Sequence, residues 1–365
     1  MIGVLCTSYP RGPDDHAGSF VRTRVRALAA AGQAVEVIAA GAGSAGSEEN
    51  LRVFRIPAAG AAEIFYAGGA PEALESGTQR ARAWLEAAHF TARMTALVAQ
   101  RAARWSAVES HWLIPSAVVA RLAAPRLPHR AHAHGGDVAL LARIPGGASL
   151  ARFLCRGGGE LVFVSGDLRE RFARVCGDAP ETLGAMTSIE PAPYDSLLFR
   201  PRSPGERQSL RERLGLQRFT VLAAGRLVPI KGFDVLVLAL GRLPAGARPA
   251  LVIAGTGPQE FRLRRLAAAC AVDLRLTGLL SPAILADWMA AADLFVHPCR
   301  SLPNGRSEGA PVVVREALAA GLSVIASAEG GLPELGDHER LTLVAPEDPS
   351  VLAAKIASLM SIDVG

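Results

Sequence analysis

The sequence is poor in lysine, aromatic residues and cysteine, and each shortage narrows what the protein can be. Only two of its 39 basic residues are lysines, Lys231 and Lys355, and aromatic residues make up 5% of the chain. The five cysteines are an odd, scattered set without C-x-x-C spacing, which argues against a disulfide framework and against a zinc site. No apolar run approaches the roughly 18 residues that a membrane-spanning helix needs, so we expect no transmembrane segment.

The positive charge of the chain is dispersed. The net charge is +5, but the arginines do not gather in a tract, and no helix-turn-helix, RNA-recognition or zinc-finger motif accompanies them. We therefore expect no nucleic-acid partner and favour an anionic small ligand or an anionic membrane surface. The start of the chain, Met1–Cys6, lacks a basic segment and predicts a first strand instead of a signal peptide. The expected localisation is cytoplasmic, with any peripheral contact at the inner face of the membrane.

The length of 365 residues, half of them hydrophobic, suits two domains. Short apolar runs alternate with helical patterns in both halves, which is typical of parallel strands joined by crossover helices. We expect an α/β fold of two Rossmann-like, doubly wound domains facing a cleft: residues 1–190, a linker over 191–218 that lacks apolar periodicity, and residues 219–365. The expected strands are 2–6, 35–39, 107–109, 131–133, 161–164, 219–224, 251–254, 274–277, 294–297 and 323–326.

A long helix is expected over residues 79–105, and one of its faces is polar and basic. At ~100° per residue, five side chains fall within ~40° of one another. They are Arg82, Glu86, Arg93, Gln100 and Arg104. Two interpretations remain open: a solvated helix face, or docking to an anionic membrane assisted by Trp84, Phe90 or Trp105.

Two cations mark a loop in the second half. The block Gly225-Arg-Leu-Val-Pro-Ile-Lys-Gly232 follows an apolar strand and precedes a helix, so Arg226 and Lys231 project from the carboxyl end of that strand. Two fixed positive charges near a helix N-terminus can hold a pyrophosphate and neutralise the charge that grows on it as it leaves. Taken alone, such a pair is more often a solvated surface feature.

Two carboxylates follow at a later strand end. Glu308 precedes Pro311, which suits a first helical turn, and Glu316 lies more than one turn inside the helix. Carboxylates so placed can accept hydrogen bonds from sugar and ribose hydroxyls, and the free amides of the first turn face an anion. As an isolated pair they would more often be a helix-terminus charge and a surface glutamate.

Taken together, these blocks resemble the GT-B glycosyltransferases of the group often called family 4, the glycosyltransferase group 1 type. The matches occur in the family's order and spacing. They are the 225–232 block, Ala-Gly-Thr-Gly-Pro at 254–258, Ala-Asp-Leu-Phe-Val-His-Pro at 292–298, the spacing of Glu308 and Glu316 with Glu-Ala-Leu-Ala-Ala-Gly at 316–321, and Gly-Gly-Leu-Pro-Glu at 330–334.

The first half is similar to the same family in three shorter stretches. Ala-Gly-Ser-Phe at 17–20 resembles the family's Gly-rich loop, Ser-His-Trp at 110–112 its His-x-His-Trp-like stretch, and His-Gly-Gly-Asp at 134–137 its His-Gly-x-Asp turn. Any one of these alone is weak, because a lone histidine beside glycine is more often structural.

The resemblance implies roles for these residues. Arg226 and Lys231 would contact the donor phosphates, Glu316 the ribose, and Glu308, with the amides of Gly309 and Ala310, the transferred sugar. In the first domain, His134 would lie near the reacting carbon, and Gly18 would let the backbone approach the donor or acceptor closely. The acceptor-side candidates are Ser19, His111 and Asp137.

The resemblance also implies a reaction, which is retaining transfer of a hexose from a nucleoside-diphosphate sugar, UDP- or GDP-linked, in polysaccharide or glycoconjugate biosynthesis. The acceptor would be a glycan, a lipid-linked or a small molecule. No Asp-x-Asp motif is present, and neither a metal nor a cofactor is expected. An epimerase of the same fold and a non-catalytic nucleotide-sugar-binding subunit remain alternatives; the Glu-x7-Glu spacing with the two cations favours the transferase.

Overall fold

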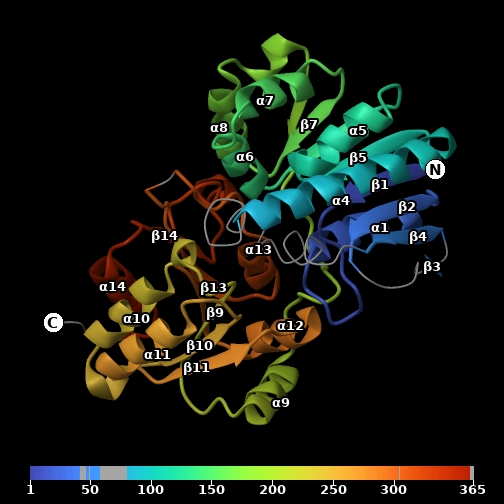
Figure 1. Cartoon of the computed structure of the whole chain (residues 1–365). Helices are drawn as coiled ribbons and strands as arrows, with labels where there is room; N and C mark the ends of the chain where they lie inside the picture. Colours follow the sequence, from blue (N-terminus) through green and yellow to red (C-terminus); the bar gives the residue numbers. More distant parts are fainter. Residues whose placement is uncertain (42–46, 49, 58–79, 304, 362–365) are drawn as a thin grey trace. The chain divides into compact units, whose positions relative to one another are not determined.

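The computed structural model describes residues 1–41, 47–48, 50–57, 80–303 and 305–361. The chain divides into two compact units, Met1–Pro193 and Tyr194–Gly365 (Figure 1). Each unit has its own largely parallel sheet with helices packed on it. Two α/β units, each with its own largely parallel sheet, confirm the predicted α/β class and its two sheet-bearing domains.

The first unit is built on an eight-stranded sheet in the order β3-β4-β2-β1-β5-β6-β7-β8. Every neighbouring pair is parallel except β3 with β4. The strands are β1 Ile2–Cys6, β2 Val35–Ala40, β3 Ser47–Glu48, β4 Leu51–Ile56, β5 Ala107–His111, β6 His129–Ala133, β7 Glu160–Phe163 and β8 Met186–Ile189. The helices are α1 Ser19–Ala30, α4 Arg80–Arg101, α5 Val118–Ala123, α6 Gly136–Leu141, α7 Gly147–Cys155 and α8 Gly166–Cys176.

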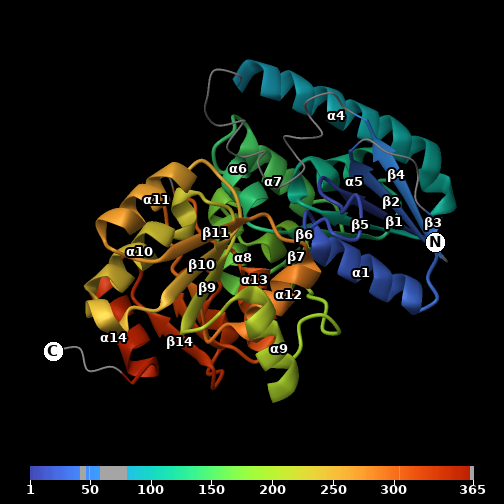
Figure 2. The ribbon, with the colours of Figure 1, turned by 90° about the horizontal axis from the view of Figure 1, so that it is seen from below.

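Helices cover both faces of this sheet because its strands are apolar on both sides. Val4 packs in the cluster that contains Val25 of α1, whereas its neighbour Leu5 packs in the cluster that contains Phe90 of α4. Successive side chains of a strand point to opposite faces. The two helices accordingly lie on opposite sides of the sheet (Figure 2). Each fully buried side chain of this size contributes roughly 1.5–3 kcal/mol.

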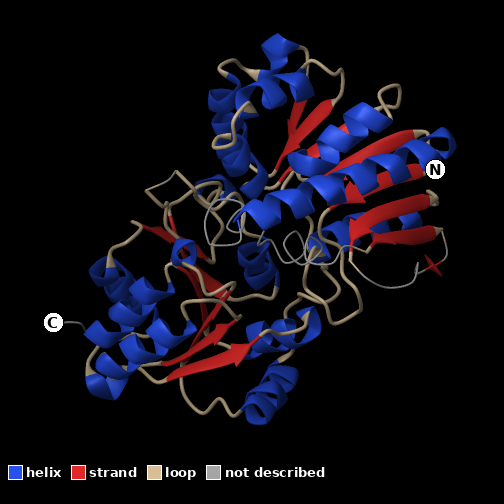
Figure 3. Cartoon of the chain, in the orientation of Figure 1, coloured by secondary structure: helices blue, strands red, loops and turns tan. Residues whose placement is uncertain are grey.

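The second unit has a six-stranded parallel sheet in the order β11-β10-β9-β12-β13-β14, with helices on both faces (Figure 3). The strands are β9 Thr220–Ala224, β10 Ala250–Ala254, β11 Leu274–Gly278, β12 Leu294–His297, β13 Ser323–Ser327 and β14 Leu341–Val344. The helices are α9 Pro204–Leu214, α10 Phe233–Arg242, α11 Glu260–Ala269, α12 Pro282–Ala291, α13 Val312–Ala319 and α14 Pro349–Leu359. Short helical turns occur in both units. In the first they are η1 Ala102–Arg104, η2 Leu113–Ala117 and η3 Pro180–Leu183, and in the second η4 Pro229–Lys231, η5 Ala245–Ala247 and η6 Pro333–Leu335.

The segment predicted as a linker, residues 191–218, contains α9. This helix has only a narrow apolar contact, made by Leu210 and half-buried Leu214 with Ala290 and Ala291, and polar contacts add to it. Ser203 and Glu206 form a capping box at its start. Arg211 donates a hydrogen bond to Asp293 at 2.9 Å, which connects the helix to the residue just before β12. Apolar periodicity could not reveal a helix stabilised in this way.

The long basic helix predicted over 79–105 is α4 followed by η1; residue 79 lies outside the described residues. Phe90 and Trp105 are buried in the core, so the expectation that they could assist at a membrane is wrong. Trp84 and Leu85, in contrast, are 37% and 73% exposed. No helix in the described part of the chain combines the length and the apolar character required to cross a bilayer.

A buried ion pair fastens the end of α4 to the sheet. Glu36 of β2 is fully buried and accepts hydrogen bonds from the Arg101 guanidinium, one of them at 2.9 Å, and from Trp105 Nε1 at 2.9 Å. Burial by itself would raise the pKa of Glu36, but these hydrogen bonds outweigh it and hold the pKa below its ordinary value. The carboxylate is therefore ionised at neutral pH.

We predict that Glu36→Ala lowers the free energy of unfolding by about 3 kcal/mol, because it leaves a largely buried guanidinium unpaired. Urea unfolding followed by tryptophan fluorescence measures the change. Glu86→Ala is the control, since Glu86 pairs with Arg82 on the exposed side of α4, and its loss should cost less than about 1 kcal/mol. The difference should shrink as the pH falls through the depressed pKa of Glu36; equal effects of both variants at neutral pH would contradict the assignment.

Candidate active site

The loop that follows β9 packs directly on the loop that follows β10, and glycines allow it. A Cβ atom on Gly255 would lie 1.9 Å from the carbonyl oxygen of Gly225, and one on Gly257 would lie 2.6 Å from that of Leu227. The amide of Leu227 also donates to Thr256 O at 2.9 Å. The predicted cation loop therefore has a fixed backbone.

The turn that carries Lys231 is fixed against the segment after β12. Lys231 ends η4, and Gly232 has a φ of 64° that favours glycine. A Cβ atom on Gly232 would lie 1.8 Å from the carbonyl oxygen of Pro298. The amide of Arg300 donates to Ile230 O at 3.0 Å. These contacts connect the loops that follow two adjacent strands, β9 and β12.

Lys231 and Glu308 form an ion pair. The distance from Lys231 Nζ to Glu308 Oε1 is 2.9 Å, and the two side chains are 16% and 14% exposed. Burial by itself would raise the pKa of Glu308, but the ammonium group of Lys231 outweighs it and the pKa lies below its ordinary value. The carboxylate of Glu308 is therefore ionised at neutral pH. The structure brings together a predicted phosphate contact and a predicted sugar contact from distant parts of the sequence.

The backbone after Glu308 is also held in place. A Cβ atom on Gly330 would lie 2.0 Å from the carbonyl oxygen of Glu308, and the amide of Gly331 donates to Gly309 O at 2.6 Å. Within the described part of the chain, the amides of Gly309 and Ala310 donate no hydrogen bond. Two backbone donors beside an ion pair are suited to an anion or a hydroxyl oxygen.

Glu316 has no partner among the described residues. It lies on α13, which begins at Val312. Pro311 is the N-cap of this helix, just before the first turn in which the sequence places it. Burial raises the pKa of Glu316 to about 7, and no neighbouring cation or donor offsets that burial. A half-buried carboxylate without a hydrogen-bond donor is costly unless a ligand supplies one.

The remaining residues of this region are Arg226 and His297. Arg226 is half-buried on the same loop as Lys231. His297 ends β12 and is fully buried, and neither ring nitrogen has a hydrogen-bond partner in the described residues. Burial first, then the charge of Lys231, lowers the pKa of His297 to about 3. The sequence motif contained His297 without a role for it; a histidine at the carboxyl end of a buried strand was the available signal.

The first unit gathers three of its predicted residues around the start of α1. Gly18 has a φ of 73°, and a Cβ atom there would lie 2.3 Å from the carbonyl oxygen of Ser8, so only glycine fits. Ser19 is then the first residue of α1. The ring of Phe20, next along the helix, lies 4.8 Å from the ring of His134.

His134 and His111 are joined by a hydrogen bond. The distance from His111 Nδ1 to His134 Nε2 is 3.1 Å, and the two rings stack at 5.3 Å between centroids. Burial lowers the pKa of both rings well below the ordinary value. Each ring is therefore neutral, and one nitrogen of each carries the proton.

Asp137 holds the turn around His134. Its two carboxylate oxygens accept hydrogen bonds from the amides of Leu113, His134, Gly135 and Val138, the shortest at 2.8 Å. Burial raises the pKa of Asp137, and the amides offset part of that rise. As an acceptor-side candidate, Asp137 has no free carboxylate edge for a ligand in this arrangement; it positions His134 instead.

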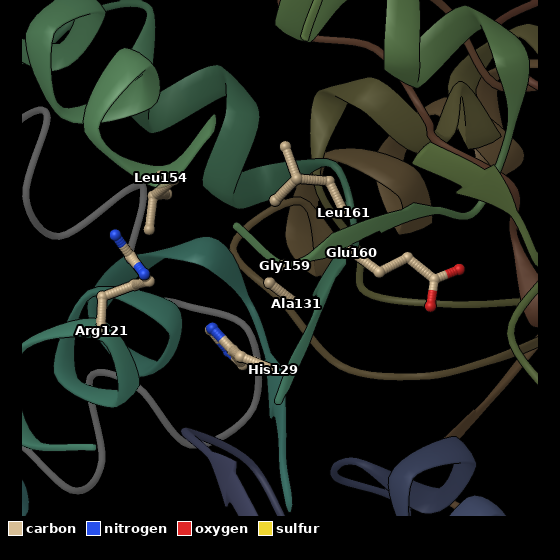
Figure 4. Close-up of a pocket in the computed structure, with 7 residues that line it drawn as sticks. All are labelled: Arg121, His129, Ala131, Leu154, Gly159, Glu160 and Leu161. Carbon is tan, nitrogen blue, oxygen red and sulfur yellow. The ribbon is translucent and has the colours of Figure 1, made fainter. Parts of the chain in front are cut away.

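A small cavity lies at the other end of the strands. Its volume is about 10 Å³, enough for about one water molecule. The side chains of Arg121 and His129 point into it, whereas Glu160 points away (Figure 4). His129 and Glu160 begin β6 and β7, so this cavity lies far along the strands from His134. It is too small for a sugar or a nucleotide.

Comparison with known proteins identifies a family model that matches part of the second unit and relatives that match more than half of this chain. Residues 218–361 match the family model described as "Glycosyl transferases group 1". A GDP-mannose-dependent alpha-(1-6)-phosphatidylinositol monomannoside mannosyltransferase of Mycobacterium tuberculosis is 40% identical over 221 residues, 59% of this chain and 55% of the relative. A GDP-mannose-dependent monoacylated alpha-(1-6)-phosphatidylinositol monomannoside mannosyltransferase of Corynebacterium glutamicum is 34% identical over 209 residues, 56% of this chain and 53% of the relative.

The chain thus spans about half the length of the curated relatives that it matches. Among solved structures, sucrose-phosphate synthase from Thermosynechococcus elongatus aligns with a TM-score of 0.75 at 20% identity, covering 99% of this chain and 90% of the other. That likeness extends over both units and concerns the fold. Residues 218–361 therefore resemble the glycosyl transferases group 1 family, and the chain shares its fold with sucrose-phosphate synthase.

Proposed function

We propose that the protein is a retaining glycosyltransferase of family 4 that moves a hexose from a nucleoside-diphosphate sugar to a glycan, lipid-linked or small-molecule acceptor. The reaction would serve cell-surface polysaccharide or glycoconjugate biosynthesis. The observation that carries the proposal is the Lys231–Glu308 ion pair at 2.9 Å, beside unused backbone amides. GDP-mannose is the first donor to test, since relatives are named for it; UDP-sugars come next.

In this mechanism the donor is held by its two ends. Lys231 and Arg226 bind the pyrophosphate and stabilise the negative charge that develops as it leaves. Glu308 and the amides of Gly309 and Ala310 bind hydroxyls of the transferred sugar, and Glu316 binds the ribose. His134 orients the sugar near its reacting carbon. No side chain is assigned as nucleophile, and the glycosidase scheme of two carboxylates does not apply to Glu308 and Glu316.

The first prediction from this proposal concerns Lys231. We expect Lys231→Ala to lower kcat by about 10²–10³-fold, as for the loss of one charge-stabilising donor. Release of nucleoside diphosphate from a panel of GDP-, UDP- and ADP-sugars, with and without acceptor extracts, measures it. The matched control is Lys355→Ala, since Lys355 is the one other lysine of the sequence and lies on α14.

The panel also decides between the alternatives. A wild-type protein that binds a nucleotide sugar and never turns it over would support the non-catalytic subunit. Conversion of the sugar without release of the diphosphate would support the epimerase. Activity of Lys231→Ala equal to that of Lys355→Ala would refute the assignment of Lys231.

Nucleotide binding should depend on pH through Glu316. Ribose hydroxyls hydrogen-bond the ionised form of Glu316, so a nucleotide lowers the pKa of about 7 that burial gives this carboxyl in the free protein. Below pH 7, binding of GDP or UDP should therefore release a proton, and affinity should rise with pH and level off above about 7. Calorimetry in buffers of different ionisation enthalpy measures the proton. Glu316→Gln should release none; an identical proton count in wild type and variant would contradict the ribose role.

We also propose a peripheral contact with the inner face of an anionic membrane through the exposed side of α4. Arg82 and Arg93 are eleven residues apart on α4, so they lie on one side of the helix; Arg104 follows in the turn η1. Leu85 supplies exposed apolar surface near its start, whereas Trp84, at ~100° per residue, lies on nearly the opposite side of the helix from Arg82. Cations and exposed apolar side chains on one helix side are typical of helices at membrane interfaces.

The third prediction tests this contact with vesicles that contain phosphatidylglycerol. We expect Leu85→Ser to lower the vesicle partition coefficient about tenfold, because burying that side chain contributes about 1.5 kcal/mol. The matched control is Phe261→Ser in the second unit, since Phe261 is 72% exposed and Leu85 73%. Co-sedimentation measures the binding. No binding by the wild type, or equal losses in both variants, would exclude α4 as the contact.

A further inference from the structure

Three potential metal ligands lie on one side of the first sheet. Glu109 and His111 are two residues apart on β5, and His132 on β6 is the register partner of His111. Side chains two residues apart on a strand share a face, and so do register partners on neighbouring strands. All three are buried, at 5%, 2% and 7% exposure. Parallel pairing therefore assembles them from separate parts of the sequence.

Their ligand atoms converge. One oxygen or nitrogen from each residue lies within 4.8 Å of those of the other two. The distance from His132 Nε2 to Glu109 Oε2 is 3.7 Å, and the rings of His111 and His132 stack at 4.6 Å between centroids with 17° between their planes. Tetrahedral zinc bonds of about 2.0–2.1 Å need the ligand atoms somewhat closer, a change that side-chain rotation can supply.

Two of these ligand atoms make no hydrogen bond to the described residues, although His132 Nε2 faces Glu109 Oε2 at 3.7 Å. The Nε2 atoms of His111 and His132 are buried, and neither takes part in a hydrogen bond with any described residue. An unsatisfied buried polar group costs about 1–3 kcal/mol. A metal ion would accept the lone pair of each nitrogen and remove that cost.

We propose that Glu109, His111 and His132 bind a divalent transition-metal ion, with Zn²⁺ the best match. Two imidazoles and one carboxylate form a common zinc set, which leaves the fourth position to water or another ligand. This site belongs to the first unit and contributes nothing to the pyrophosphate contacts of Lys231. The expectation that the donor site needs no metal is unaffected, and the inference does not depend on the proposed function.

Arg24 limits the strength of the site. Its guanidinium donates to Glu109 Oε1 at 2.8 Å and to Oε2 at 3.1 Å. Such contacts orient a ligating carboxylate. They also place a positive charge near the metal, so the site binds zinc more weakly than a closed structural zinc site does.

Metal binding has a consequence for His134. When Nε2 of His111 coordinates the ion, the proton of that neutral ring resides on Nδ1 and is donated to Nε2 of His134 at 3.1 Å. The proton of neutral His134 then resides on its own Nδ1. The ion thereby fixes the tautomer and the orientation of the histidine that the sequence predicts near the reacting carbon.

The test is zinc binding by the full chain after treatment with a chelator. We expect one Zn²⁺ per chain to remain after equilibrium dialysis, as measured by elemental analysis. X-ray absorption of the zinc-loaded wild type should show two imidazole ligands and one carboxylate. Zinc coordinated by oxygen alone, or by fewer than two imidazoles, would overturn the proposal without any variant.

Substitutions locate the ion. His132→Gln should lose the bound zinc and the zinc-induced rise of the melting temperature, with circular dichroism confirming that the variant is folded. The matched control is His129→Gln: His129 is buried on the same strand but on the other face, with Nε2 at 2.8 Å from Ser110 Oγ. It should keep the zinc. Retention of zinc by folded His132→Gln would disprove the site, and failure to bind zinc would leave the transferase proposal intact.

Discussion

Direct backbone contact at glycines is the constraint on which the candidate site depends. At Gly232 there is no room for even a methyl group beside the carbonyl oxygen of Pro298, and at Gly255 none beside that of Gly225. These contacts bring the loops after three neighbouring strands to one edge of the sheet. Lys231 can then reach Glu308 without a flexible connection between them. Close backbone packing, which leaves little room for movement, therefore positions the charged side chains of the site.

The charged side chains of the site differ in whether they have a partner of opposite charge. Lys231 and Glu308 are paired, so each offsets the cost of burying the other, whereas Glu316 has no described partner and the pKa of its carboxyl is raised to about 7. A ligand that carries both a diphosphate and hydroxyl groups can satisfy all three. The diphosphate of such a ligand competes with Glu308 for the ammonium group of Lys231. Its hydroxyl groups can donate hydrogen bonds to the carboxylates of Glu308 and Glu316. Binding therefore replaces the Lys231–Glu308 ion pair, and the burial of Glu316 without a partner, with contacts to the ligand.

Sequence periodicity predicted the inner strands and missed elements held by polar contacts. β9 and β12 are buried along their whole length and are apolar apart from Thr220 and His297, as is typical of parallel strands covered on both faces. α9 exposes most of its surface and depends on a capping box and on Asp293, neither of which produces a periodic signal. β8, at the edge of its sheet, is largely exposed. For the site, motif spacing predicted Lys231 and Glu308, but the isolation of His297 and the amide contacts of Asp137 depend on three-dimensional contacts that spacing does not encode.

The histidine cluster shows why register matters more than motif spacing. Glu109 and His111 stand close in sequence, yet His132 joins them only because β5 and β6 pair so that His111 faces it. A shift of one residue would turn His132 to the other face of the sheet. The packing of β5 against β6 in this register brings three polar groups together. Because His111 also contacts His134, the same packing couples a metal-binding arrangement to the predicted reaction site of the first unit.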